Sequence, residues 1–367
     1  MTHPRYTRLL DSLPATVPFV GPEVIERTTG QPFSARLGAN ENIFGPSPKA
    51  LEALRQADAE IWKYPDSASH DLKTLIAAQN GVGYDNVVIG EGVDGLLGYL
   101  ARMMIEPGDT VVTSDGAYPT FNFHVAGFGG VLHKVPFTDD HEDLDALITR
   151  AAEVDAKLLY LSNPDNPMGT YLPGETVVAA LDRLPEGCLM ILDEAYIELA
   201  PADARAEIAI EDARVIRMRS MSKAYGLAGA RVGYALGAAP LIKNFDKIRN
   251  HFGMNRSAQH AALAALQDVE WLAHIQSQVT HARARLSQIA EDNGLTPIPS
   301  ATNFVTMDCG QDGTYAAKVV QELGKRGIFA RMPGVAPLNR CIRISCGPDA
   351  ALDLFAAELP QALKAAL

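Results

Sequence analysis

One lysine in this chain has the neighbours that a lysine needs for covalent chemistry. Lys223 lies in the run Ser220-Met221-Ser222-Lys223-Ala224-Tyr225-Gly226, shortly after the apolar pair Val215 and Ile216. An apolar, β-branched pair predicts a strand, so we expect the lysine at a strand end rather than on a solvated helix. A lysine that forms an imine with a carbonyl needs partial desolvation and a cationic neighbour, because both lower its pKa.

The residues around Lys223 also suit a phosphate. Ser220 and Ser222 offer small hydroxyls, and Arg231, eight residues after the lysine, offers a rigid fork of donors. A carbonyl cofactor that carries a phosphate fits all three features, and pyridoxal 5'-phosphate is such a molecule. Taken alone, the motif is equally compatible with a solvated lysine on a glycine-containing loop.

Composition narrows the choice of partners. The chain has 367 residues, 47% of them hydrophobic, which is enough for one large core and a smaller one. Its 44 acidic and 32 basic residues give a formal net charge of −12, and no run of lysine or arginine concentrates positive charge. We therefore expect neither nucleic acid nor a membrane as a partner, and local arginines must capture any anionic substrate.

The cysteines and the N-terminal segment indicate in which cellular compartment the protein is expected. Cys188, Cys309, Cys341 and Cys346 show neither C-x-x-C spacing nor histidine-rich surroundings, so we expect no metal and no disulfide framework. The N-terminus lacks the apolar core of a signal peptide, and no apolar run approaches the roughly 18 residues of a membrane span. The expectation is a soluble cytoplasmic protein.

Short apolar runs alternate with amphipathic segments from residue 87 onward, which predicts an α/β fold. Strands that are apolar throughout and separated by helices favour a mostly parallel, seven-stranded sheet covered on both faces. Ligands bind such sheets at the carboxyl ends of the strands. The expected strands are Val87–Ile89, Thr110–Thr113, Val131–Val135, Lys157–Leu161, Cys188–Leu192, Val215–Arg219 and Val232–Leu236.

The chain is expected to divide into three parts. Residues 1–34 are rich in proline and threonine with little periodicity, which predicts an N-terminal arm. Residues 35–252 should form the large cofactor-binding domain. Residues 253–367, where a long helical stretch precedes short strands and further helices, should form a small C-terminal α+β domain.

Polar motifs follow several of the expected strands. Gly92, Val93 and Asp94 open a helix and could bind a phosphate through backbone N–H groups, although an ordinary strand-to-helix turn explains them as well. The segment Asn163-Pro164-Asp165-Asn166-Pro167-Met168-Gly169 should hold a rigid turn. Asp193, in Asp193-Glu194-Ala195-Tyr196, places a carboxylate at the ligand crevice or caps the next helix.

Together and in this order, the motifs resemble the class I/II aminotransferases of the fold-type I pyridoxal-phosphate enzymes. The histidinol-phosphate aminotransferase branch is the most similar. The resemblance runs from about residue 37 to 347 and is carried by Asn-Pro-x-Asn-Pro-x-Gly, Asp-Glu-Ala-Tyr, Ser-x-Ser-Lys-Ala and Arg-x-Gly-Tyr at the spacings of the family. It implies pyridoxal 5'-phosphate as the cofactor and a homodimer with shared active sites.

The resemblance also assigns roles at the cofactor. Lys223 would bind it covalently and later carry a proton, and Asp193 would pair with the pyridine nitrogen. Asn166 and Tyr196 would donate hydrogen bonds to the ring oxygen. Phe121 would stack on the ring, unless it only packs in the core. The phosphate would be bound by Gly92, Val93, Asp94, Ser220, Ser222 and Arg231.

Two further residues match family positions less directly. His124 lies where some relatives carry a histidine behind the aspartate carboxylate, although a purely structural histidine fits equally well. Tyr64 matches a tyrosine that, in the family, reaches the cofactor phosphate of the neighbouring subunit.

Four residues are expected at the substrate. Arg343 matches the arginine that binds a substrate carboxylate or phosphate, and Arg331 matches a second arginine near the substrate phosphate or is simply solvated. We also expect Asn42 there. The family usually has a tyrosine at Phe19, and phenylalanine cannot supply its hydroxyl to a phosphate.

The resemblance implies an aminotransferase acting on histidinol phosphate or a related amino acid, with 2-oxoglutarate as the acceptor. An aromatic amino acid as donor fits the same arginines. A decarboxylase of the same fold is the third possibility, since the reaction depends on which bond at the substrate Cα lies perpendicular to the ring. A binding protein without activity does not explain why Lys223, Asp193 and Arg231 are all present.

Overall fold

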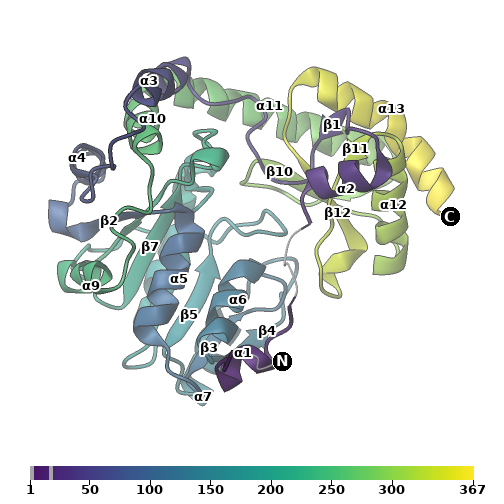
Figure 1. The fold of residues 1–367 in the computed structure, drawn as a ribbon. Helices are drawn as coiled ribbons and strands as arrows, with labels where there is room; N and C mark the ends of the chain where they lie inside the picture. The colour runs from purple at the N-terminus through teal and green to yellow at the C-terminus, as the bar shows by residue number, and fades with distance from the viewer. Residues whose placement is uncertain (1–3, 16–19) are drawn as a thin grey trace.

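The computed structural model describes residues 4–15 and 20–367. A seven-stranded sheet forms its larger part, with the strand order β2-β8-β7-β6-β5-β3-β4 (Figure 1). Strand β8 is antiparallel to both of its neighbours and the other pairs are parallel. All seven expected strands are present, so the α/β prediction is confirmed. They are β2 (Val87–Gly90), β3 (Thr110–Ser114), β4 (Val131–Val135), β5 (Leu158–Ser162), β6 (Leu189–Asp193), β7 (Val215–Ser220) and β8 (Gly233–Leu236).

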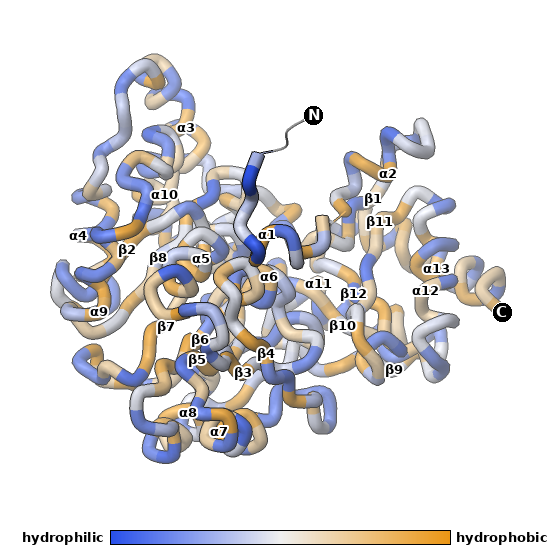
Figure 2. The backbone as a smooth tube through the Cα atoms, turned by 60° about the horizontal axis from the view of Figure 1, so that its bottom comes forward, coloured by the Kyte–Doolittle hydropathy of each residue, from blue (hydrophilic) through white to orange (hydrophobic). Residues whose placement is uncertain are grey.

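Helices cover both faces of this sheet. On one face, α5 (Gly92–Met104) and α6 (Pro119–Gly127) pack with strand residues such as Tyr160. On the other face, α7 (Leu144–Glu153) and α8 (Gly174–Leu181) pack with its neighbours Leu159 and Leu161. Successive side chains of a strand point to opposite faces, so one apolar run supplies both layers. In Figure 2 the outer helices α7 and α8 carry both colours, as helices with one buried face should.

The smaller part contains a three-stranded antiparallel sheet with the order β12-β10-β9. Helices α12 and α13 pack against each other beside it. The long helix α11 runs along the top of Figure 1 from the large part to the small one. The elements of this region are α11 (Val269–Asp292), β9 (Thr296–Pro297), β10 (Phe304–Asp308), α12 (Gly313–Lys325), β11 (Ile328–Phe329), β12 (Cys341–Ser345) and α13 (Asp349–Ala366).

Contacts cross the predicted boundary between the large and the small domain. Strand β1 (Ala35–Arg36) pairs in parallel with β11 of the small part. Helix α10 (Arg256–Gln267) packs against α3 (Pro48–Asp58) and α4 (His70–Gln79) of the large part. Helix α9 (Ala239–Asn244) precedes it along the chain. The division at 34/35 and 252/253 therefore stays a prediction.

The N-terminal arm contains two helices that the sequence did not predict, α1 (Arg8–Ser12) and α2 (Pro22–Thr29). Helix α2 begins with a proline in its first turn and ends at Gly30, whose φ is 72°. Both are usual helix boundaries. Glu23 and Glu26 on α2 pair with Arg36 at 2.8 and 2.7 Å, so the helix is tied to strand β1.

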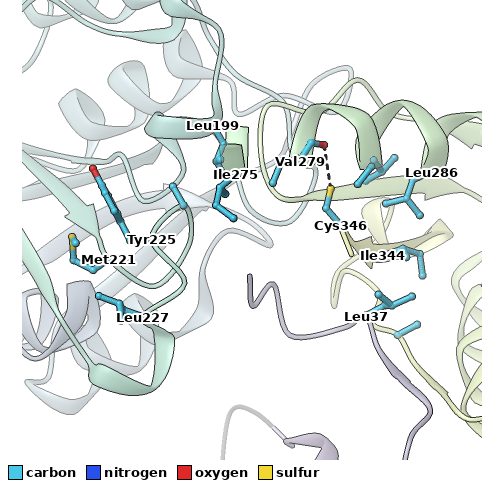
Figure 3. Packing of buried hydrophobic residues seen from close by; sticks show 14 of the residues in the cluster. Leu37, Leu199, Met221, Tyr225, Leu227, Ile275, Val279, Leu286, Ile344 and Cys346 are labelled. Carbon is cyan, nitrogen blue, oxygen red and sulfur yellow. Dashed lines mark hydrogen bonds between the residues drawn. The ribbon is translucent and has the colours of Figure 1, made fainter. Parts of the chain in front are cut away.

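One hydrophobic cluster reaches from the Lys223 segment into the small part. Figure 3 shows Met221, Tyr225 and Leu227 in this cluster, on both sides of the lysine in the sequence. The cluster continues through α11 to β12, where the Cys346 thiol contacts the Val279 carbonyl at 3.9 Å. The backbone that carries the lysine is thereby fixed by buried neighbours.

The described residues contain neither a membrane-spanning helix nor a cluster of metal ligands. None of their helices is long and apolar enough to cross a membrane. Within the same part of the chain, no group of three or more histidine, cysteine or acidic side chains could hold a metal ion.

Candidate active site

Lys223 lies just beyond the carboxyl end of β7, at the junction of the two parts. Its Nζ donates a hydrogen bond to the Asn40 carbonyl at 3.1 Å and lies 5.4 Å from the centre of the Tyr196 ring. Burial lowers the pKa of Lys223 to about 8, and the positive charges of Arg343 and Arg231 act in the same direction. The amine therefore has both of the features that imine chemistry requires.

Asp193 ends the neighbouring strand β6 and is 4% exposed. Its Oδ2 accepts a hydrogen bond from the Tyr160 hydroxyl at 2.7 Å, and its Oδ1 accepts one from the Ala195 amide at 3.0 Å. Burial raises the pKa of Asp193 to about 6, against the opposing effect of these donors and of Lys223. The carboxylate is held in one orientation with its charge near the lysine.

Asn166 and Tyr196 lie beside this carboxylate. The Asn166 amide oxygen accepts a hydrogen bond from the Arg343 guanidinium, and the Tyr196 hydroxyl accepts one from the Asn40 amide at 3.1 Å. Burial raises the pKa of Tyr196, so its hydroxyl keeps its proton and remains a donor. Together with Lys223, these groups border a cavity of about 260 Å³.

The other end of this cavity suits an anion. Gly92, the first residue of α5, has a φ of 79°, and a Cβ built on it would lie 2.5 Å from the Arg231 guanidinium. Only glycine allows this close approach. Arg231 donates to the Ser222 hydroxyl at 3.5 Å, and the Ser222 amide donates to the Ser220 hydroxyl at 3.0 Å. A helix N-terminus and an arginine thus meet two serines, which is a suitable set of donors for a phosphate.

Val93 and Asp94 line the same end of the cavity, as the sequence predicts. The residues of this cavity therefore fit pyridoxal 5'-phosphate in three respects. The cavity has a lysine of lowered pKa, a buried carboxylate in the same lining, and a phosphate cradle that a side chain at Gly92 would fill.

Phe121, which is expected to stack on the cofactor ring, does not border this cavity. Phe121 is fully buried and stacks on Tyr160, with ring centres 4.7 Å apart. Tyr118, immediately before Pro119 at the start of α6, lines the cavity instead. Residues three apart on the first turn of a helix can both face the sheet, and the one nearer the strand ends reaches the cavity.

His124 does not lie behind Asp193. Its Nε2 is 3.0 Å from the Asp94 carboxylate, so it joins α6 to the first turn of α5. The partner of Asp193 is Tyr160 on strand β5, which the sequence reasoning missed. The available signal was a single hydroxyl-bearing side chain in the apolar run Leu158-Leu159-Tyr160-Leu161.

A second cavity of about 600 Å³ shares Lys223 and Asn166 with the first and extends to both predicted substrate arginines. Arg343 is 9% exposed, and its Nε is buried without a hydrogen-bond partner among the described residues. Burial lowers the pKa of Arg343 to about 10, and the charge of Arg331 contributes. Arg331 donates to the Val20 carbonyl at 2.8 Å, so the part of the arm just before α2 lies at this cavity.

The structure gives Asn42 a role different from the expected one. Its amide nitrogen donates to the Ala224 carbonyl at 3.1 Å, and its amide oxygen accepts from the Phe44 amide. The side chain is thus used to fix the lysine segment and borders neither cavity. Asn40, two residues earlier, lines the substrate side. Asn40 and Asn42 are the same residue type two positions apart, and no local pattern in the sequence distinguishes them.

Two predicted residues lie away from these cavities. Phe19 lies outside the described residues, so its predicted role is untested. Tyr64, between α3 and α4, is 80% exposed and borders neither cavity. Its ring packs against Phe252, with centres 5.0 Å apart.

Comparison with known proteins identifies the family. The model of the family described as aminotransferase class I and II matches residues 35–359. The chain belongs to this family. Its membership confirms the predicted fold type, transaminase activity and pyridoxal-phosphate cofactor.

The similar proteins are close in length to this chain. Histidinol-phosphate aminotransferase 2 of Carboxydothermus hydrogenoformans is 34% identical over 361 residues, which is 97% of this chain and 99% of the relative. The crystal structure of histidinol-phosphate aminotransferase from Sinorhizobium meliloti in complex with pyridoxal-5'-phosphate is 53% identical, with a TM-score of 0.96. That comparison covers 99% of this chain and 98% of the other.

A more distant structure shares the fold alone. N-succinyldiaminopimelate aminotransferase from Mycobacterium tuberculosis is 24% identical, with a TM-score of 0.84 over 98% of this chain and 100% of the other. One scaffold therefore serves different amino donors, and the substrate must be argued from the side chains of the site.

Proposed function

We propose that this aminotransferase uses histidinol phosphate as its amino donor and 2-oxoglutarate as its acceptor. The observation that carries the proposal is the arginine pair beside Lys223, in which the buried Nε of Arg343 has no partner among the described residues. A buried, incompletely paired guanidinium is costly unless an anion meets it. The relatives named histidinol-phosphate aminotransferase support the same choice.

Both proposed substrates offer an anion to these arginines. Histidinol phosphate carries a phosphate monoester and 2-oxoglutarate carries two carboxylates, and a guanidinium fork binds either group through paired hydrogen bonds. The backbones of Arg331 and Arg343 are joined by a hydrogen bond of 2.6 Å, which keeps the two side chains on adjacent segments. One anion site can thus serve both halves of a transamination.

Pyridoxal 5'-phosphate, when bound, supplies an electron sink that stabilises negative charge at the substrate Cα. Lys223 is the base that takes the proton from that carbon, because its lowered pKa leaves a useful fraction of neutral amine near neutral pH. Asp193 would hold a proton on the ring nitrogen, and Asn166 and Tyr196 would hold the ring oxygen. Arg231 and the serines would hold the phosphate.

A half-reaction screen tests the donor. Holoenzyme is mixed with histidinol phosphate, phenylalanine or aspartate in separate experiments, and the loss of the bound cofactor's absorbance is followed. We expect histidinol phosphate to react with the highest ratio of rate to half-saturating concentration. A faster reaction with phenylalanine would favour the aromatic aminotransferase, and release of carbon dioxide without a keto product would favour the decarboxylase.

Substitution of the arginines tests the anion site. Arg331→Gln should lower kcat/KM for histidinol phosphate about ten- to a hundredfold, the usual loss of a charge-assisted hydrogen bond. The same variant should change kcat/KM for phenylalanine much less, because that donor has no phosphate. An equal loss for both donors would show that Arg331 does not recognise the phosphate.

We propose further that the enzyme is a homodimer with shared active sites, located in the cytoplasm. Ile61, Trp62 and Tyr64 are 68%, 78% and 80% exposed, and Phe252 beside them is 51% exposed. An exposed apolar patch of this kind suits an interface with a second copy. The four cysteines are free thiols, as expected in a reducing compartment.

A further inference from the structure

Tyr160 contacts the buried carboxylate of Asp193 and has no role in the function described so far. It lies in the middle of β5, is fully buried, and donates its hydroxyl proton to Asp193 Oδ2 at 2.7 Å. In the apolar run Leu158–Leu161 it is the only residue with a polar side-chain atom. A buried hydroxyl in such a strand needs a partner, and its partner here is Asp193.

The Tyr160 ring is fixed independently of that hydrogen bond. It stacks on Phe121, with ring centres 4.7 Å apart and planes inclined by 17°. Both rings belong to the core between the sheet and α6. Since Phe121 and Tyr160 are both 0% exposed, packing holds the ring, and with it the position of the hydroxyl, in addition to the hydrogen bond to Asp193.

Asp193 therefore has a fixed donor on each oxygen, the Tyr160 hydroxyl on Oδ2 and the Ala195 amide on Oδ1. Each carboxylate oxygen can still accept one more hydrogen bond. The two donors set the plane of the carboxylate and leave acceptor capacity for a group in the cavity. Burial raises the pKa of Asp193, whereas the Tyr160 hydroxyl and the Ala195 amide counteract that rise because they favour the charged form.

We propose that Tyr160 is a positioning residue that keeps the Asp193 carboxylate oriented and ionised for the cofactor ring nitrogen. The proposal depends on the proposed function only in that a pyridine ring occupies the cavity that Asp193 and Tyr160 both line. His124, the other candidate for this role, pairs with Asp94 instead. Without the hydroxyl, Asp193 would keep its place in the strand. A smaller fraction of its carboxylate would be ionised, and one constraint on the rotation of the side chain would be lost.

The test is Tyr160→Phe, which removes one oxygen atom and keeps the ring and its stacking. Apoprotein is titrated with pyridoxal 5'-phosphate, and the absorbance of the bound cofactor is then followed against pH without substrate. We expect the Kd for pyridoxal 5'-phosphate to rise about tenfold. We also expect the pH at the midpoint of the absorbance transition to differ from that of the wild type. With substrate, kcat should fall about tenfold while KM for the donor stays nearly constant.

A double-mutant cycle with Asp193→Asn separates positioning from simple packing. If Tyr160 acts through Asp193, Tyr160→Phe should add almost nothing to the effect of Asp193→Asn on the Kd for pyridoxal 5'-phosphate. Additive effects would overturn the proposal. So would a Tyr160→Phe protein with the cofactor affinity and absorbance transition of the wild type.

Tyr315→Phe is the matched control. Its hydroxyl donates to the Leu363 carbonyl at 3.2 Å, within the small part and away from both cavities. We expect the melting temperature to fall slightly and the cofactor affinity to stay unchanged. Because titration and absorbance use no amino donor, they remain decisive even if histidinol phosphate is the wrong substrate.

Discussion

At the scale of single residues, the site works because burial and charge act together on Lys223. The amine loses water on burial, and Arg343 and Arg231 disfavour its protonated form, so its pKa falls to about 8. An unperturbed lysine titrates about two units higher. Both effects support the proposal that Lys223 is the nucleophile, whereas exposed lysines such as Lys364 lack the burial that it requires.

The first prediction concerns the covalent bond. Lys223→Ala should still bind pyridoxal 5'-phosphate through Asp193 and the phosphate cradle, but borohydride should no longer fix the cofactor to the protein. Turnover should fall more than about a thousandfold, because one group acts as both nucleophile and base. Lys157→Ala, which removes a partly exposed lysine paired with Asp109, is the control and should keep both properties. Residual turnover near the wild-type rate would contradict the assignment.

The second prediction concerns the pKa of the same lysine. In apoprotein, the rate at which an amine-specific reagent modifies Lys223 should rise with pH and reach half its maximum near pH 8. The pKa is lowered in the fold, so the neutral, reactive amine is present at a lower pH than in an unfolded chain. Arg343→Gln should raise the midpoint, since one positive charge is removed. A midpoint above about pH 10 would argue against burial of this amine.

At the scale of elements, the site forms where the carboxyl ends of neighbouring strands lie side by side. The register pairs Ser162 of β5 with Asp193 of β6, and Asp193 with Met218 of β7, so the segments after these strands meet at one edge of the sheet. Asn166 follows β5, and Lys223 follows β7. Apolar strands joined by helices therefore determine where the polar motifs converge.

Most of the strands could be predicted because they are buried, mainly apolar runs, and so could the motifs that follow them; β4, which is partly exposed and contains His133 and Lys134, is the exception. Which of two nearby side chains reaches the cavity could not be predicted. Tyr118 and Phe121 are both aromatic and three residues apart, and only the start of α6 decides which one reaches the cavity. The partner of Asp193 depends on the register between β5 and β6, which no local pattern encodes.

The third prediction concerns the loop after β5. Asp165 and Glu142 are both buried, and Glu142 accepts hydrogen bonds from the Ser114 hydroxyl at 2.8 Å and the Ser162 amide at 3.1 Å. Burial raises the pKa of Asp165 to about 7, and burial and the nearby Asp165 raise the pKa of Glu142. The folded protein therefore binds protons that the unfolded chain has released above about pH 4.

The sign of the effect on stability follows from these shifts. Because the folded-state pKa is raised, this contribution is fully present below about pH 4 and is lost as the pH rises through about 7. Asp165→Asn should flatten the decrease in melting temperature between about pH 5 and pH 8. Glu186→Gln, at an exposed glutamate, is the control and should leave the slope unchanged. Equal slopes for Asp165→Asn and wild type would show that Asp165 is ionised in the fold.

At the scale of the whole molecule, a net negative protein holds its anionic ligands with a few local arginines. The formal net charge is −12, yet Arg231, Arg331 and Arg343 all face the two joined cavities. Arg331 also binds the N-terminal arm through the Val20 carbonyl. The large sheet, the small part and the arm therefore each contribute to one site.

The last prediction concerns the second copy of the chain. Trp62→Glu places a charge in the exposed apolar patch of Ile61, Trp62, Tyr64 and Phe252. We expect sedimentation to show wild type at twice the protomer mass of 39.4 kDa and the variant to shift toward a single protomer. Its affinity for pyridoxal 5'-phosphate should fall as well, since Tyr64 of each copy would no longer reach the site of the other.

Two further variants separate assembly from cofactor binding. Tyr64→Phe should stay dimeric but bind pyridoxal 5'-phosphate several-fold more weakly, because only the donor to the phosphate is lost. Val131→Glu places the same charge at a 44% exposed apolar residue on β4, the edge strand opposite β2, and should leave the mass unchanged. If Trp62→Glu keeps the mass of the wild type, or if Tyr64→Phe binds the cofactor normally, the sites are not shared through this patch.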